Sequence, residues 1–225
     1  MPCIIMDVQL LLQTFLYAAN VVLGFAVAVP LGITTGDFDG GCILYADMDW
    51  TKKPRPLYLL SHGINCKFGI SVSVSFCILY GLGMLSYHVY VLTRKDPRIG
   101  SKMWVILFIL LNSVITFVTF IASCMISVGL KMFCDSFLKG RDFGRNINSC
   151  ADAQKWGWYE HGTDYRIQDN FYTYLTVTQI ATWATFLVWV LQVVLGIIRF
   201  ARNRRLARAQ ETTDLGNFAS ASPSA

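Results

Sequence analysis

Four long stretches without an acidic or basic residue constrain the fold of this chain more than any other feature. They cover about residues 8–33, 68–93, 103–130 and 171–198. Each is longer than the roughly 20 apolar residues that a helix needs to cross the hydrocarbon core of a bilayer. A membrane β-barrel would instead show short segments of alternating hydrophobicity. The sequence therefore predicts an all-α membrane protein folded as a four-transmembrane-helix bundle.

The distribution of charge predicts the orientation of this bundle. Basic residues are dense between the second and third stretches, at 94–102, and after the fourth, at 199–208. Such clusters are typical of cytoplasmic segments. Both termini are then expected in the cytoplasm, and the loops at 34–67 and 131–170 on the extracellular or lumenal side. The net charge of +5 is explained by these juxtamembrane clusters, so nucleic acid is not an expected partner.

The two ends of the chain have separate interpretations. Residues 1–200 are predicted to form the membrane domain, and 201–225 a basic juxtamembrane segment followed by a disordered tail beyond Ala209, since the tail is small and polar. Ala26-Val27-Ala28 resembles a signal-peptidase site. The absence of Lys or Arg before the apolar run favours a retained first helix over a cleaved signal peptide. Cys3 is a candidate for palmitoylation, with an unmodified thiol as the alternative.

Four of the seven cysteines fall in or beside the two outer loops: Cys42, Cys66, Cys134 and Cys150. An even number of cysteines in an oxidising compartment predicts two disulfides. Pairing within each loop is the simplest of the three connectivities, and pairing across the loops stays open. A metal site at Cys42, His62 and Cys66 is a weaker alternative because the spacing lacks a close cysteine pair. No metal or other cofactor is expected.

Within the four stretches, the notable feature is the absence of Asp, Glu, Lys and Arg. Ion-coupled transporters use such groups inside the membrane, so a transporter is disfavoured. His88 lies near the cytoplasmic end of the second stretch and is expected at the membrane interface beside Tyr87 and Tyr90. No nucleophile and base are arranged as in an enzyme, and no catalytic residue is predicted.

Small and amide residues in the stretches indicate helix contacts. Rows of small residues at every fourth position allow helices to approach closely. Four amides are available for hydrogen bonds between helices: Asn20, Asn112, Gln179 and Gln192. A pore lined by Asn112, Thr116 and Thr119 is an alternative that would require an oligomer.

Three segments carry a resemblance to a known family. They are VAVPLGITTGDFDGGCILY at 27–45, FIASCMISVGLKMFCDSFLK at 120–139 and NFYTYLTVTQIATWATFLVWVLQ at 170–192. These segments resemble the transmembrane protein 179 family, and the cysteines at positions 66 and 150 also match its pattern. The resemblance implies a protein with four membrane spans and implies no reaction or ligand.

The leading functional hypothesis is a non-enzymatic accessory, scaffolding or trafficking protein. It would lie in the plasma membrane or a secretory-pathway membrane and act through contacts with membrane lipids and other membrane proteins. The alternative is a small homo-oligomeric channel. An enzyme acting on lipids is a third hypothesis, and it lacks a convincing arrangement of acidic or histidine residues.

Overall fold

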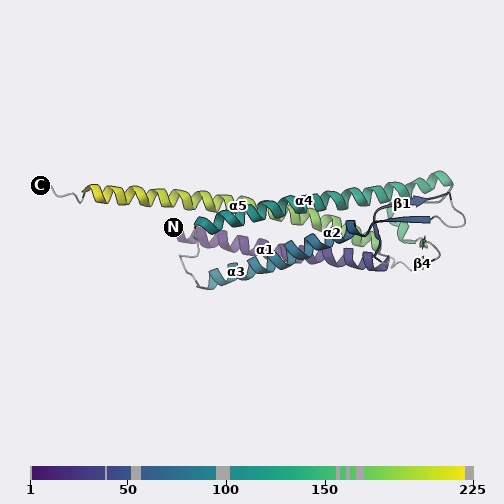
Figure 1. Cartoon of the computed structure of the whole chain (residues 1–225), viewed down its shortest axis with the longest axis horizontal. Helices are drawn as coiled ribbons and strands as arrows, with labels where there is room; N and C mark the ends of the chain where they lie inside the picture. The colour runs from purple at the N-terminus through teal and green to yellow at the C-terminus, as the bar shows by residue number, and fades with distance from the viewer. Residues whose placement is uncertain are drawn as a thin grey trace.

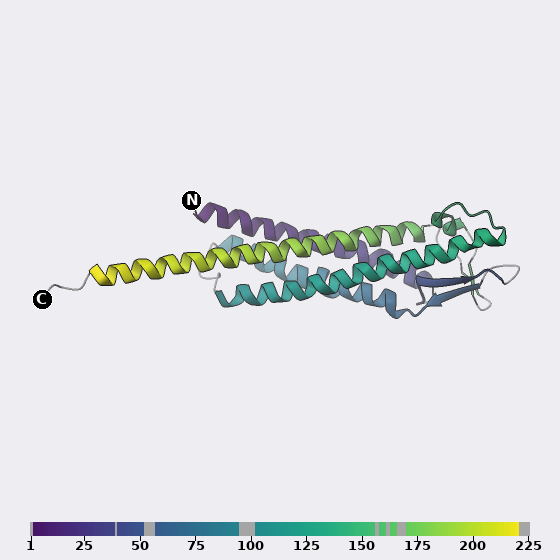
Figure 2. The same ribbon diagram turned by 90° about the horizontal axis from the view of Figure 1, so that it is seen from above.

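Four helical segments of the described residues are long and apolar enough to cross a membrane: Val8–Asp37, Ile64–Thr93, Val105–Phe143 and Phe171–Arg205. The computed structural model describes residues 2–38, 40–51, 57–94, 102–155, 158–160, 163–165 and 170–220. The segments form an elongated bundle with both chain ends at one end, the termini end, and the strands at the other, the hairpin end (Figures 1 and 2). The prediction of a four-helix membrane bundle is confirmed. Most of the basic connection predicted at 94–102 lies outside the described residues.

The helices extend beyond the predicted uncharged stretches. Their bounds are α1 (Pro2–Asp37), α2 (Ile64–Val72), η1 (Ser73–Tyr80), α3 (Gly81–Arg94), α4 (Lys102–Leu138) and α5 (Phe171–Ser220). Segments α2, η1 and α3 follow one another directly as a single span, in which η1 is a π-helix. Pro30 lies inside α1 without ending it, as membrane helices allow.

The predicted disordered tail does not begin at Ala209, because α5 continues as a helix to Ser220. The expectation was wrong for the described part of this segment. Ala, Arg, Leu, Gln and Glu at 206–211 are good helix formers. Extending an existing helix also avoids the unfavourable nucleation step, so a polar composition does not by itself end the helix.

The loops at 34–67 and 131–170, called the outer loops after the side of the membrane expected for them, contain short strands that the sequence had not indicated. Strand β1 (Cys42–Asp49) pairs antiparallel with β2 (Leu57–Ser61), and β3 (Trp158–Glu160) pairs antiparallel with β4 (Thr163–Tyr165). Two 3₁₀-helices, η3 (Lys139–Phe143) and η4 (Cys150–Lys155), lie in the second loop. The pairing of β1 is irregular between Cys42 and Asp47, where Tyr45 has a φ of 65°. These elements form the hairpin end.

Buried side chains gather in two clusters along the bundle. The cluster at the hairpin end includes Phe133, Phe137 and Phe171. The second cluster is centred on Tyr17 and Trp189, with partly buried aromatic neighbours. Many large apolar side chains point outward instead, and Phe15, Phe117 and Ile180 are each more than 60% exposed. This exterior suits a bundle whose solvent is lipid, since burial against lipid replaces burial in a core.

Candidate functional site

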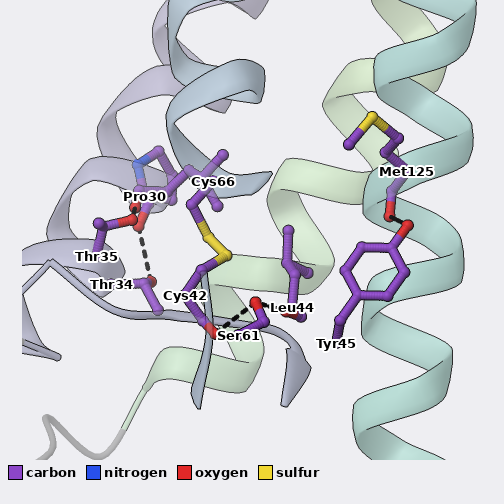
Figure 3. The surroundings of a disulfide bond; sticks show 10 residues. Pro30, Thr34, Thr35, Cys42, Leu44, Tyr45, Ser61, Cys66 and Met125 are labelled. Atoms are coloured by element: carbon purple, nitrogen blue, oxygen red, sulfur yellow. Dashed lines mark hydrogen bonds between the residues drawn. A yellow bond between two sulfur atoms is a disulfide. The ribbon is translucent and has the colours of Figure 1, made fainter. Parts of the chain in front are cut away.

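Two disulfides join the outer loops to the helices that carry them. Cys42 at the start of β1 is bonded to Cys66 in α2, and Cys134 in α4 is bonded to Cys150 in η4. The first bond is completely buried beside the end of α1 (Figure 3). Of the connectivities left open by the sequence, the structure has the pairing within each loop. The alternative metal site is not formed, because both of its sulfur atoms are in a disulfide.

Strand β1 is fastened along α4. The hydroxyl of Tyr45 donates a hydrogen bond to the Met125 carbonyl at 2.9 Å (Figure 3). Near the end of α4, Ser136 accepts two hydrogen bonds, one from β1 and one from the turn that follows the strand. The N–H of Met48 donates to its hydroxyl oxygen at 2.9 Å, and the indole N–H of Trp50 donates to its carbonyl at 3.1 Å. The first outer loop is therefore held by α4 as well as by its disulfide.

The second outer loop is held by hydrogen bonds to charged side chains. The carboxylate of Asp152 accepts the backbone N–H groups of Ser149 and Asn148, both at 2.9 Å. These two bonds lower the pKa of the Asp152 carboxyl below its usual value. The Nε–H of Arg141 donates to the Ile147 carbonyl at 2.6 Å. These bonds hold the part of the second loop at 141–152.

A small cavity lies between α1, α3, α4 and α5 in the half of the bundle nearer the termini, and both polar and apolar side chains line it. Its volume is about 40 Å³. Asn112 of α4 lies on its wall and donates to the Tyr17 hydroxyl of α1 at 3.0 Å, and its oxygen accepts from the Tyr80 hydroxyl at 2.9 Å. The predicted role of Asn112 in hydrogen bonds between helices is found in the structure. The tyrosines that it binds were not singled out in the sequence.

His88 is on the wall of the same cavity and is buried, with 5% of its surface exposed. Its Nδ1 is 2.8 Å from the Met84 carbonyl one turn earlier, and its ring centre is 5.0 Å from that of Tyr17. His88, expected at the membrane interface, is thus buried inside the bundle and not on its outer surface. Helical periodicity places positions 84 and 88 on one face, and this face packs on α1.

The other predicted amides differ in their partners. The side-chain N–H of Gln192 donates to the backbone carbonyl of Gln13 at 3.1 Å. The side-chain N–H of Gln179 donates to the Ser127 hydroxyl at 3.3 Å. Asn20 is fully buried and neither of its side-chain polar atoms has a partner among the described residues.

The residues of the alternative pore are engaged within the bundle. The Thr116 and Thr119 hydroxyls donate to carbonyls of their own helix, and Asn112 is bonded to the tyrosines described above. These hydrogen bonds account for their polar groups without a water-filled pore.

A pattern in the sequence could have indicated the cavity. Gln13 and Tyr17 are four residues apart, which places both polar side chains on one face of the first helix. Gln192 and Arg199 are seven residues apart, about two turns of α5, so they also lie on one face of their helix. Polar side chains on one face of an otherwise apolar span indicate an interior polar site.

Four membrane-spanning helices with two disulfide-bonded outer loops define a multi-span membrane protein of the tetraspan class. The family model for the transmembrane protein 179/179B claudin domain matches residues 9–219, so the chain belongs to this family. Transmembrane protein 179B of Danio rerio is 27% identical over 190 residues, which cover 84% of this chain and 83% of that protein. The resemblance seen in the sequence is confirmed. No solved structure matches the chain.

Proposed function

We propose that this protein is a non-enzymatic accessory, scaffolding or trafficking protein that acts through contacts with other membrane proteins. The proposal is carried by the hairpin end, where two disulfides and the hydrogen bonds to α4 hold both outer loops. A surface held in this way is suited to a lasting contact, because little conformational entropy remains to be lost on binding.

The proposed orientation has the hairpin end outside the cytoplasm and both termini inside it. Disulfides persist in the secretory pathway and at the cell surface, which supports a plasma-membrane or secretory-pathway location. At the opposite end, α5 carries Arg204, Arg205 and Arg208 after the uncharged stretch at 171–198. Arginine at this position favours the cytoplasmic side.

One pair of side chains resembles a catalytic arrangement and bears on the non-enzymatic part of the proposal. The hydroxyl of Ser136 donates a hydrogen bond to the carboxylate of Asp47. A serine next to a base is one arrangement of a nucleophile. Here the same oxygen accepts the N–H of Met48, and the serine is 5% exposed. The contact joins β1 to α4, and a substrate would have to displace the strand to reach the hydroxyl.

The first experiment is purification of the tagged full-length protein in mild detergent, with mass determination and identification of co-purifying proteins. One heterologous membrane protein at fixed stoichiometry is the expected result. A double variant, Cys134→Ala with Cys150→Ala, should recover less of that partner, whereas Cys124→Ala should recover it unchanged because Cys124 is not in a disulfide. A homo-oligomer that conducts ions in planar bilayers would replace this proposal with the channel.

Orientation is tested by tagging the C-terminus and adding protease to intact cells. The tag should be cleaved only after the plasma membrane is permeabilised. Cleavage in intact cells would contradict the proposed orientation.

A further inference from the structure

The arginines that follow the uncharged stretch of α5 fall into two groups. Arg204, Arg205 and Arg208 are exposed, whereas Arg199 and Arg202 are partly buried. The two partly buried arginines are three residues apart, so their side chains are neighbours on the surface of the helix. They form a pair that packs against the bundle, and it is called the arginine pair below.

Helix α1 orients the outer member of this pair. Nη1 of Arg202 donates a hydrogen bond to the side-chain oxygen of Gln9 at 3.3 Å. The side-chain N–H of Gln9 donates in turn to the Leu195 carbonyl of α5 at 2.8 Å. Gln9 therefore connects two turns of α5 and fixes the position of the Arg202 guanidinium. Arg199 lies about 4.5 Å nearer the hairpin end along the helix axis and lines the cavity between the four helices.

The positive charge of the pair is not compensated by the part of the chain that the structure describes. Neither Arg199 nor Arg202 forms an ion pair with an acidic side chain there, and the acceptor from Gln9 is a neutral amide oxygen. Removing a cation from water without a counter-ion is unfavourable. Two partly buried guanidinium groups on one helix face therefore favour an anion.

The depth of the pair in the membrane indicates where this anion comes from. At the termini end, the four uncharged stretches begin or end at about residues 8, 93, 103 and 198. The stretches of 26–28 residues are about 40 Å long as helices, close to the thickness of a bilayer with its headgroups. Arg199 and Gln9 each lie one residue from such a boundary, so the pair is at the level of the lipid phosphates. A lipid can place its phosphate there without leaving the bilayer.

The charge of the pair and its depth together define a ligand class. We propose that the arginine pair binds the phosphate group of an anionic phospholipid from the leaflet at the termini end. Guanidinium groups match phosphate oxygens with paired hydrogen bonds. A phosphomonoester carries up to two negative charges, so phosphatidic acid is the matching probe for two arginines. The exposed arginines attract anionic lipids only through the surface potential, which selects no position for a single lipid.

The first test compares ligands with and without the phosphate. Native mass spectrometry of the full-length protein in mild detergent measures binding of phosphatidic acid, of diacylglycerol with the same chains, and of inorganic phosphate. Phosphatidic acid should bind at least about tenfold more tightly than diacylglycerol. Equal binding of these two lipids would overturn the proposal. Tight binding of inorganic phosphate alone would overturn the lipid as its source and assign the pair to a soluble phosphate.

Matched variants distinguish this site from a general attraction of charge. Arg199→Gln with Arg202→Gln should weaken phosphatidic acid binding about tenfold or more, whereas Arg204→Gln with Arg205→Gln, which removes the same charge, should change it by less than about twofold. Equal weakening by these two double variants would refute the site.

A third variant leaves every charge in place. Gln9→Leu removes the acceptor that orients Arg202 and should weaken phosphatidic acid binding about twofold to fivefold. General attraction of charge predicts no change in this variant, so unchanged binding would contradict the proposed positioning by α1. An unchanged thermal unfolding midpoint without lipid is the control for folding of each variant, and the comparison of ligands requires no variant.

Discussion

Replacing Gly129 with alanine should loosen the attachment of β1 to α4. Gly129 faces the strand, and an added Cβ would lie 2.9 Å from the Leu44 Cβ and 2.8 Å from a ring carbon of Tyr45. Real Cβ atoms almost never approach so closely, so one neighbour must move. Tyr45 is restrained by its hydrogen bond to the Met125 carbonyl and by its backbone φ of 65°.

The magnitude follows from comparison with a second helical glycine. Gly32 in α1 has no atom within 4 Å of an added Cβ. Both substitutions gain the same helix propensity, roughly 1 kcal/mol. Overpacking at Gly129 costs about 1–3 kcal/mol, so this is the expected difference between the two variants in the free energy of opening β1. It corresponds to roughly a 5-fold to 150-fold difference in the fraction of open molecules.

Hydrogen-exchange mass spectrometry of the peptide at 42–50 measures that opening. The exchange of this peptide should be faster in Gly129→Ala than in the unsubstituted protein, and unchanged within about twofold in Gly32→Ala, because local opening controls exchange of protected amides. Equal protection of β1 in the two variants would refute the reasoning, since it would mean that the strand does not depend on close packing at Gly129.

Three further perturbations test other parts of the structure. Replacing Cys134 and Cys150 together with alanine removes a crosslink between residues 16 apart, which should destabilise the second loop by at most about 3 kcal/mol and speed its limited proteolysis; an unchanged cleavage rate would contradict this. Two backbone N–H groups lower the Asp152 pKa in the folded protein. The contribution of this carboxylate to loop stability should therefore be complete above about pH 4 and be lost as pH falls through the lower folded pKa. NMR titration should detect this loss, and Asp152→Asn should abolish the pH dependence. Tyr17→Phe removes the acceptor of the Asn112 amide and should destabilise the bundle by about 0.5–2 kcal/mol. The variant should then have a lower thermal unfolding midpoint, and an unchanged midpoint would mean that the hydrogen bond contributes no net stability.

The number of spans and the location of the disulfides were predictable from the sequence. A bilayer requires long apolar helices whose backbone groups are satisfied internally, so the stretches at 8–33, 68–93, 103–130 and 171–198 are sufficient to predict the bundle. Cysteines outside these stretches predict crosslinks in the outer loops. Both inferences depend on composition and on position along the chain, which a sequence states directly.

The contacts of individual side chains depended on the tertiary structure. Three disulfide connectivities were consistent with the sequence, and the pairing of Cys42 with Ser61 between β1 and β2 brings Cys42 close to Cys66. The polar composition after Ala209 predicted disorder, yet the helix continues, because elongation of α5 needs no new nucleus.

The cavity shows the same division between sequence and structure. Gln13, Gln192 and Arg199 are visible in the sequence as polar or charged residues in or beside two spans, but they come from opposite ends of the chain. They line one cavity only because α1 packs on α5. A sequence determines which residues prefer lipid, since that preference is a property of each side chain. The tertiary structure decides which polar groups share an interior, since that depends on how the helices are rotated against one another.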